Sequence, residues 1–104
     1  MIRLDPDRRR VYGPRGQTEL TKVEYRLLQR FVVEGFNRPI SNDALLEYTW
    51  PYLKPGLAKA SFWERIYRIR LALLHVGGAR IVCIRRIGYK IEAIPTPVAF
   101  ARAA

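Results

Sequence analysis

Apolar residues recur at helical spacing in two long stretches of this chain. One stretch covers about residues 22 to 34, where the apolar positions are Val23, Leu27, Leu28 and Phe31. The other covers about residues 61 to 75, where Phe62, Ile66, Ile69 and Leu73 are spaced four, three and four apart. Because an α-helix has about 3.6 residues per turn, each set falls within a narrow arc of one face. The pattern therefore predicts two amphipathic helices that pack on one core.

Local end signals set the bounds of these helices and add a short one between them. Thr21 and Glu24 have capping-box spacing and Gly35 is a C-terminal stop, so the first helix is predicted from about residue 22 to 34. Ser41 is a favourable N-cap and predicts a second helix that ends near residue 50. A loop is predicted at Lys-Pro-Gly, residues 54–56, and the Gly-Gly pair at residues 77–78 is predicted to end the third helix.

Short apolar runs separated by turn residues predict strands at both ends of the chain. The runs lie at residues 2–4, 11–12 and 18–20 near the N-terminus and at residues 81–85 and 88–94 near the C-terminus. The first group predicts a small antiparallel meander, and the second predicts a hairpin with Arg86 and Ile87 at its tip. We expect one α+β domain over residues 1–95 and a flexible tail at residues 96–104.

The composition fits one globular domain with an anionic partner. The chain has 104 residues, of which 49% are hydrophobic, so it can bury a core without disulfides or a metal. Its 19 basic and 9 acidic residues leave a net charge of +10. Residues 51–104 hold ten basic and two acidic side chains, a net charge of +8. Positive charge that is concentrated in one half of the chain predicts a binding face. The alternative is a basic surface that is merely solvated.

The sequence lacks the residue patterns that several classes of function require. Cys83 is the only cysteine and His75 the only histidine, so neither a disulfide framework nor a metal-ligand cluster is expected. No nucleophile is paired with a base and no glycine-rich phosphate loop occurs, so we expect neither an enzyme nor a cofactor. The sequence has no run typical of a signal peptide or a membrane span, which predicts a cytoplasmic, nucleoid-associated protein.

The third predicted helix and the C-terminal hairpin carry the candidate chemistry. Glu64, Arg65 and Arg68 are expected on the side of the helix opposite the core, where arginine can bond guanine and glutamate can accept from cytosine. The hairpin segment 84–90 carries three cations and a tyrosine. An arginine at its tip can enter a narrow minor groove, and Tyr89 can donate to a phosphate. The alternative is a solvated turn with Tyr89 in the core.

Four strings of this sequence resemble one family of bacterial regulators. They are LTKVEYRLL at residues 20–28, SNDALLEYTW at residues 41–50, IYRIRLAL at residues 66–73 and IRRIGYKI at residues 84–91. In this order they resemble the OmpR/PhoB-type effector domain of response regulators, over about residues 1–94. The resemblance implies a winged helix-turn-helix with a four-stranded N-terminal sheet, three helices and a C-terminal wing. It also implies transcription regulation through sequence-specific binding of double-stranded DNA.

The resemblance assigns roles by position. Glu64, Arg65 and Arg68 match the base-reading face of the third helix, and Arg85 matches the minor-groove arginine of the wing. Arg86 adds a cation where the family usually has glycine. The expected contacts to the DNA backbone are Trp50, Ser61, Arg70, Tyr89 and Lys90. The family also implies two copies arranged head to tail on direct repeats.

Three departures from the family pattern change the expectations. Trp63 replaces a small or polar residue, and it is expected to pack against a loop or a sugar. Residues 51–59, which touch RNA polymerase in activators of the family, carry Lys54 and Lys59 and no acid, which argues against that contact. Because the sequence starts at the first strand of the effector domain, we expect either a stand-alone winged helix without a phosphorylated receiver or a domain excised from a response regulator.

Two other kinds of binding remain open. The basic surface could dock on an acidic partner, such as another regulator or RNA polymerase, without reading bases. It could also bind DNA as a non-specific architectural protein, because phosphate and minor-groove contacts need no base readout. Salt separates the protein partner from DNA, since the logarithm of a DNA affinity falls by about 0.9 per neutralised phosphate for each log unit of salt.

Overall fold

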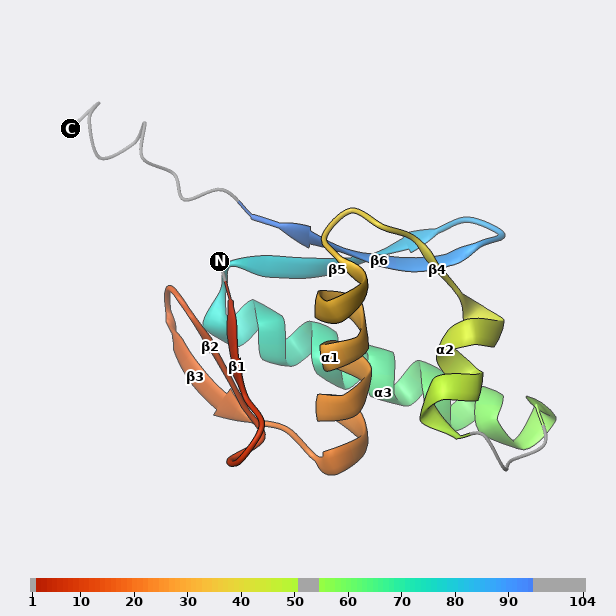
Figure 1. The fold of residues 1–104 in the computed structure, drawn as a ribbon, viewed down its shortest axis with the longest axis horizontal. Helices are drawn as coiled ribbons and strands as arrows, with labels where there is room; N and C mark the ends of the chain where they lie inside the picture. The colour runs from red at the N-terminus through yellow and green to blue at the C-terminus, as the bar shows by residue number, and fades with distance from the viewer. Residues whose placement is uncertain (1, 51–54, 95–104) are drawn as a thin grey trace.

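Three helices and two three-stranded antiparallel sheets make up the described part of the chain (Figure 1). The computed structural model describes residues 2–50 and 55–94, with side chains in the second range from residue 61 onward. This combination of elements confirms the α+β class. The tail predicted at residues 96–104 lies outside the described residues. No helix in the two described ranges is long and apolar enough to cross a membrane.

Two helices have the bounds that their end signals indicate. Helix α1 spans Lys22–Glu34 and starts with a complete capping box, in which the Glu24 N–H donates to the Thr21 hydroxyl and the Thr21 N–H donates to the Glu24 carboxylate. Helix α2 spans Asn42–Thr49, and the Ser41 hydroxyl accepts a backbone N–H of its first turn at 3.1 Å. Both predictions are confirmed, because a cap is a local interaction that sequence spacing alone determines.

Helix α3 begins earlier than its apolar pattern indicates. It spans Pro55–Val76, whereas the pattern predicts a start near Ser61. The predicted loop at residues 54–56 is wrong from Pro55 onward, because proline is favourable in the first turn of a helix, where its missing N–H is not needed. Ser61 therefore lies inside the helix, not at its start. The side chains of residues 51–59, the segment that the resemblance relates to RNA polymerase, lie outside the described part.

The N-terminal sheet is the predicted meander. Its strands are β1 (Arg3–Asp5), β2 (Arg10–Gly13) and β3 (Gly16–Glu19), paired in that order. The fourth strand that the resemblance implies is absent from residues 2–21, so that expectation is wrong. Only two residues separate β3 from α1: Leu20, which is buried, and Thr21, which caps the helix. This connection leaves no length for another strand.

The second sheet contains the predicted hairpin and a short third strand. Its strands are β4 (Ile40–Ser41), β5 (Ala79–Ile84) and β6 (Gly88–Ala93), in the order β4-β6-β5. Gly88 lies so close to β4 that a Cβ atom there would stand 2.0 Å from the Ile40 carbonyl oxygen. We call the β5–β6 hairpin the wing. The end of the wing next to its tip is thus held against the residues that start α2, where the Asn42 N–H donates to the Ile87 carbonyl at 3.1 Å.

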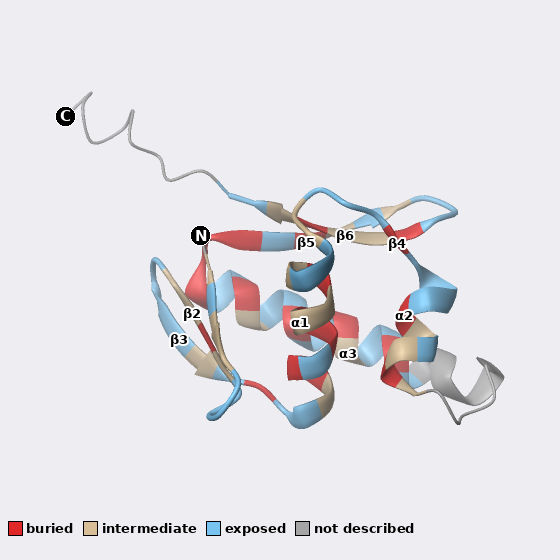
Figure 2. Ribbon diagram, in the orientation of Figure 1, coloured by how far each residue is buried: buried red, intermediate tan, exposed pale blue. Residues whose placement is uncertain are grey.

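The core lies where α1, α3 and the second sheet meet, and buried segments alternate with exposed ones along α1 and α3 (Figure 2). The predicted stripe of α3 is confirmed, because its four residues are at most 2% exposed. They share the core with Leu27, Leu28 and Phe31 of α1, Leu45 of α2 and Ile91 of β6. Burial of one side of α3 leaves its opposite side facing outward.

Candidate nucleic-acid interface

The outward side of α3 is a mixed polar and aromatic surface. Glu64, Tyr67 and Arg68 are all exposed. Arg68 Nη2 lies 3.1 Å from Glu64 Oε1, one helical turn earlier, and both side chains are more than half exposed. An exposed pair at this spacing contributes only about 0.3–0.5 kcal/mol. Arg68 can therefore exchange its carboxylate partner for a base or a phosphate at little cost.

Arg65 does not lie on this outward side, and that part of the sequence prediction is wrong. Its Nη1 atom lies 3.2 Å from Oε2 of Glu24, which is buried at the start of α1, and its Nε atom is buried without a hydrogen-bond partner. Arg65 follows Phe62 by three residues and precedes Ile69 by four, a spacing that turns it toward the core side of the helix. It joins α3 to α1.

Two aromatic side chains belong to the exposed surface of α3. Tyr67 exposes 61% of its surface and Trp63 exposes 55%. The sequence reasoning missed Tyr67, although its position three residues after Glu64 places it on the same side of the helix. In a major groove, such apolar edges can contact thymine methyl groups.

The tip of the wing carries cations that no carboxylate of the described residues neutralises. Arg85, Arg86 and Ile87 form the tip, and all three are exposed. Arg86 has a φ of 68°, in the left-handed region that glycine adopts without strain. The backbone at this position therefore keeps a glycine-like conformation, and the arginine side chain is added to it.

The strands of the wing are fixed to α3 by aromatic and cationic contacts. The rings of Phe62 and Tyr89 meet edge to face with centroids 6.0 Å apart. The Arg70 guanidinium lies 5.5 Å from the Tyr89 centroid, and its Nε donates to the Ile81 carbonyl at 3.2 Å. Burial raises the pKa of the Tyr89 phenol, so the hydroxyl stays a proton donor at neutral pH. The wing and α3 thus form one rigid surface.

Solved structures with the same architecture identify the fold. No protein-family model and no curated protein matches this sequence. The DNA-binding domain of Bacillus subtilis CssR is similar with a TM-score of 0.69 and 24% identity, covering 88% of this chain and 99% of that one. The DNA-binding domain of Klebsiella pneumoniae RstA, in complex with the RstA box, has a TM-score of 0.70 and 23% identity, covering 88% and 90%. The fold is the OmpR/PhoB-type winged helix.

A third neighbour extends the comparison to a more distant sequence. The C-terminal domain of the lantibiotic response regulator NsrR has a TM-score of 0.74 and 16% identity, covering 90% of this chain and 94% of that one. The winged-helix fold is therefore retained while most side chains differ. Contacts to a ligand have to be assigned from the side chains of this chain, not from the fold.

The winged helix brings only part of the predicted site to one open surface. Glu64 and Arg68 of α3 and the arginines of the wing tip are exposed, as is Ser61. Trp50 is half-buried and packs on the core, and Lys90 is also half-buried, with its Nζ 3.9 Å from Glu92. Figure 1 shows the wing tip and α2 at the same end of the molecule. The accessible site is thus smaller than the sequence pattern indicates.

Proposed function

We propose that this winged helix is a transcriptional regulator that binds double-stranded DNA sequence-specifically, with the outward side of α3 in the major groove and the wing tip in the minor groove. The observation that carries the proposal is the pair Arg85 and Arg86, exposed without a carboxylate partner among the described residues, on a wing that is locked to α3. Guanidinium groups favour the negative potential of a narrow minor groove. Because the strands of the wing are fixed to α3, the two contacts have a fixed spacing.

Base readout is proposed for the outward side of α3. Arg68 is the candidate for a bidentate contact with guanine, and Glu64 can accept from cytosine. Tyr67 extends this surface by one apolar contact. Arg65 takes another role, because its guanidinium is paired with the buried carboxylate of Glu24. We assign it to positioning α3 against α1.

Backbone contacts are proposed around this surface. Ser61 is exposed on α3, and the hydroxyl of Tyr89 is a protonated donor beside Arg70. Such groups hold a winged helix in register on DNA without reading sequence. Trp50 and Lys90 are half-buried, so we propose that they meet the duplex only with their exposed edges.

Similar domains support this proposal. The DNA-binding domain of the response regulator AdeR, solved in complex with an intercistronic region, has a TM-score of 0.68 and 17% identity to this chain, covering 89% and 95%. RstA is likewise in complex with its own box. By analogy, two copies of the present chain would bind direct repeats head to tail, and the protein would lie on the nucleoid.

The proposal is tested by selecting bound fragments from random duplex DNA and measuring affinity by fluorescence anisotropy. The selection should yield one consensus, and Arg68→Ala should lower affinity for it by about tenfold or more while relaxing the preference at one base position. Arg8→Ala, which removes an exposed arginine from the turn after β1, is the matched control and should change neither quantity.

Two results would contradict sequence-specific binding. Selection without a consensus, together with an unchanged preference in Arg68→Ala, would indicate architectural binding through phosphates and the minor groove. An affinity for duplex DNA that is weak and nearly independent of salt would indicate that the cations serve a protein partner instead.

A further inference from the structure

A second surface lies on α3, toward its C-terminal end, and Leu71 separates it from Arg68 of the proposed base-reading surface. Leu71, Leu74 and Ile94 are 47%, 69% and 42% exposed. Leu71 and Leu74 belong to the last two turns of α3, and Ile94 follows β6. Large apolar side chains that gather on the surface of a small, highly charged protein indicate an interaction site. They are not needed for the core, which is complete beneath them.

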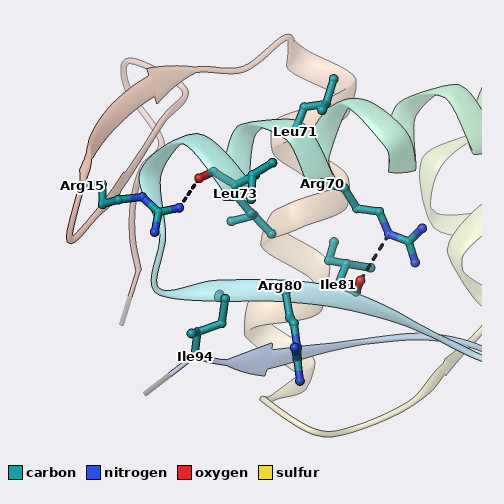
Figure 3. A pocket seen from close by; sticks show the side chains of 9 residues that line it. Arg15, Arg70, Leu71, Leu73, Arg80, Ile81 and Ile94 are labelled. Carbon is teal, nitrogen blue, oxygen red and sulfur yellow. Dashed lines mark hydrogen bonds between the residues drawn. The ribbon is translucent and has the colours of Figure 1, made fainter. Parts of the chain in front are cut away.

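These side chains border a groove between α3 and the outer end of the wing sheet (Figure 3). Its volume is about 400 Å³. The floor consists of Leu73, Ala79 and Ile81, all of them buried. The floor is therefore fixed by the core, while the two exposed leucines and Ile94 project at the border. We call this surface the α3–β5 groove.

The α3–β5 groove is apolar inside and cationic at its edge. Arg15, Arg70 and Arg80 line it together with the apolar residues. Arg15 donates to the Leu74 carbonyl and so holds its guanidinium over the end of α3 (Figure 3). Arg80 Nε lies 3.5 Å from Glu92, but the same carboxylate also lies 3.9 Å from the Lys90 ammonium. One carboxylate shared by two cations leaves this edge with surplus positive charge.

We infer that the α3–β5 groove docks an acidic, amphipathic segment of a partner protein. Projecting leucines would be buried by apolar side chains spaced one helical turn apart, and carboxylates beside them would meet the arginines at the edge. This occupant combines both features of the surface. The groove contains neither Arg68 nor the wing tip, and it shares only Arg70 with the residues expected to contact the DNA backbone.

Charge argues against the other occupants. A second copy of this chain carries a net charge of +10 and would bring like charge to a cationic edge. The chain's own residues 95–104 contain Arg102 as their only charged side chain, which has the same sign. A DNA phosphate could pair with the arginines but would leave the leucines in water. An acidic protein segment matches both the charge and the apolar surface.

The test uses the full chain and a synthetic probe. The probe is a fluorescein-labelled helical peptide of about five turns, with leucines at positions i, i+4 and i+7 and glutamates elsewhere. Fluorescence anisotropy should detect its binding, and Leu74→Ser should weaken it by about tenfold or more, as expected for loss of one buried leucine side chain. Val33→Ser removes a similarly exposed apolar side chain from α1 and should leave binding unchanged.

A second variant and a second peptide test the charge at the edge. Arg80→Glu should lower the affinity for the acidic peptide by about tenfold. Replacing the glutamates of the peptide by glutamines should lower its affinity for the wild-type protein by a similar factor. Both protein variants carry exposed substitutions, so their melting temperatures should stay near that of wild type. If a variant unfolds, Ile94→Ser replaces it, because Ile94 borders the same groove from the end of β6.

Four outcomes would overturn the inference. They are no binding of the acidic peptide, equal binding by Leu74→Ser, concentration-dependent dimerisation of wild type that Leu74→Ser abolishes, and loss of duplex-DNA affinity in Leu74→Ser as large as the loss for the peptide. The third would identify a second copy as the occupant, and the fourth would make the groove part of the DNA surface. Retained DNA binding with lost peptide binding supports the inference.

Discussion

The two β-hairpins of this winged helix are each held in place by a glycine that lies close to a carbonyl oxygen, but they differ in whether their arginines have partners within the protein. In the wing, Gly88 faces the Ile40 carbonyl, where a Cβ atom would lie at 2.0 Å. In the β2–β3 hairpin, Gly13 faces the Val76 carbonyl at the end of α3, where a Cβ atom would lie at 2.5 Å. In both hairpins the absence of a side chain allows the backbone to approach a carbonyl oxygen closely.

The hairpins differ in what their cations do. In the N-terminal hairpin, Arg10 bonds Gln17 at 3.2 Å and lies 3.9 Å from Glu19, while the tip residue Arg15 donates back to α3. In the wing, Arg85 and Arg86 have no carboxylate partner among the described residues. The cations of the N-terminal hairpin thus make contacts within the protein that hold it to the fold, although the charge of Arg15 is not neutralised by its carbonyl partner. A hairpin with unsatisfied cations is available to an anionic ligand.

The largest expected effect is the loss of stability on replacing Gly88 or Gly13, the two glycines that anchor the hairpins. Gly88→Ala should lower the free energy of unfolding by about 3 kcal/mol, because the added methyl meets backbone that cannot move away as a side chain can. Gly13→Ala should cost somewhat less, about 2 kcal/mol, since its closest approach is longer. Urea unfolding measures both. A loss below about 0.5 kcal/mol in either variant would show that the glycine is not an anchor.

The same two variants also test whether the wing contacts DNA while the β2–β3 hairpin only stabilises the fold. At a temperature where both remain folded, Gly88→Ala should weaken DNA binding beyond the loss expected from its unfolded fraction, because the wing has to shift. Gly13→Ala should bind DNA in proportion to its folded fraction. Equal behaviour of the two variants would mean that the hairpins do not differ in function.

The next effect is on the wing cations. Arg85→Ala should lower DNA affinity by about tenfold and reduce the slope of log affinity against log salt by about 0.9. Arg10→Ala is the matched change in the other hairpin and should leave both within error, because Arg10 is held by Glu19 and Gln17. Anisotropy titrations at four salt concentrations measure these slopes. An equal loss in both variants would contradict the contrast between the hairpins.

A smaller effect comes from two arginines with left-handed backbone. Arg86 at the wing tip has a φ of 68°, and Arg9 before β2 has a φ of 53°. Replacing either by glycine should raise the free energy of unfolding by up to about 1 kcal/mol, because the steric penalty of this region disappears. Arg86→Gly should nevertheless bind DNA several-fold more weakly, whereas Arg9→Gly should not. A higher DNA affinity of Arg86→Gly would show that the Arg86 guanidinium does not contact DNA.

Sequence signals predict the elements of this fold best where the determining contacts are local. The capping box at Thr21 and the N-cap at Ser41 set the starts of α1 and α2 correctly, because each joins residues three apart. The start of α3 is misjudged, since Pro55 is compatible both with a turn and with the first turn of a helix. Local spacing cannot decide between the two.

The candidate site is less predictable because tertiary contacts decide which side chains remain free. Arg65 and Glu24 are 41 positions apart, so no periodicity reveals that they pair. Tyr67 could have been found by placing every residue of α3 on the helical wheel, not only the charged ones. The α3–β5 groove is formed jointly by α3, β5 and Arg15, and only the folded chain brings these together.

The smallest expected effect distinguishes a tyrosine in each hairpin. Tyr89→Phe keeps the ring on Phe62 and removes only the hydroxyl, so stability should stay within about 0.5 kcal/mol while DNA affinity falls about threefold at every site, as for one solvent-exposed hydrogen bond at the low end of the usual range. Tyr12→Phe keeps the ring under Arg3, 4.7 Å from its guanidinium, and should change neither quantity. Because burial raises the pKa of the Tyr89 phenol from its ordinary value, the hydroxyl keeps its proton, and the threefold difference should be constant from about pH 6 to 9. A difference confined to one site, or one that grows toward pH 9, would contradict a phosphate contact by the neutral phenol.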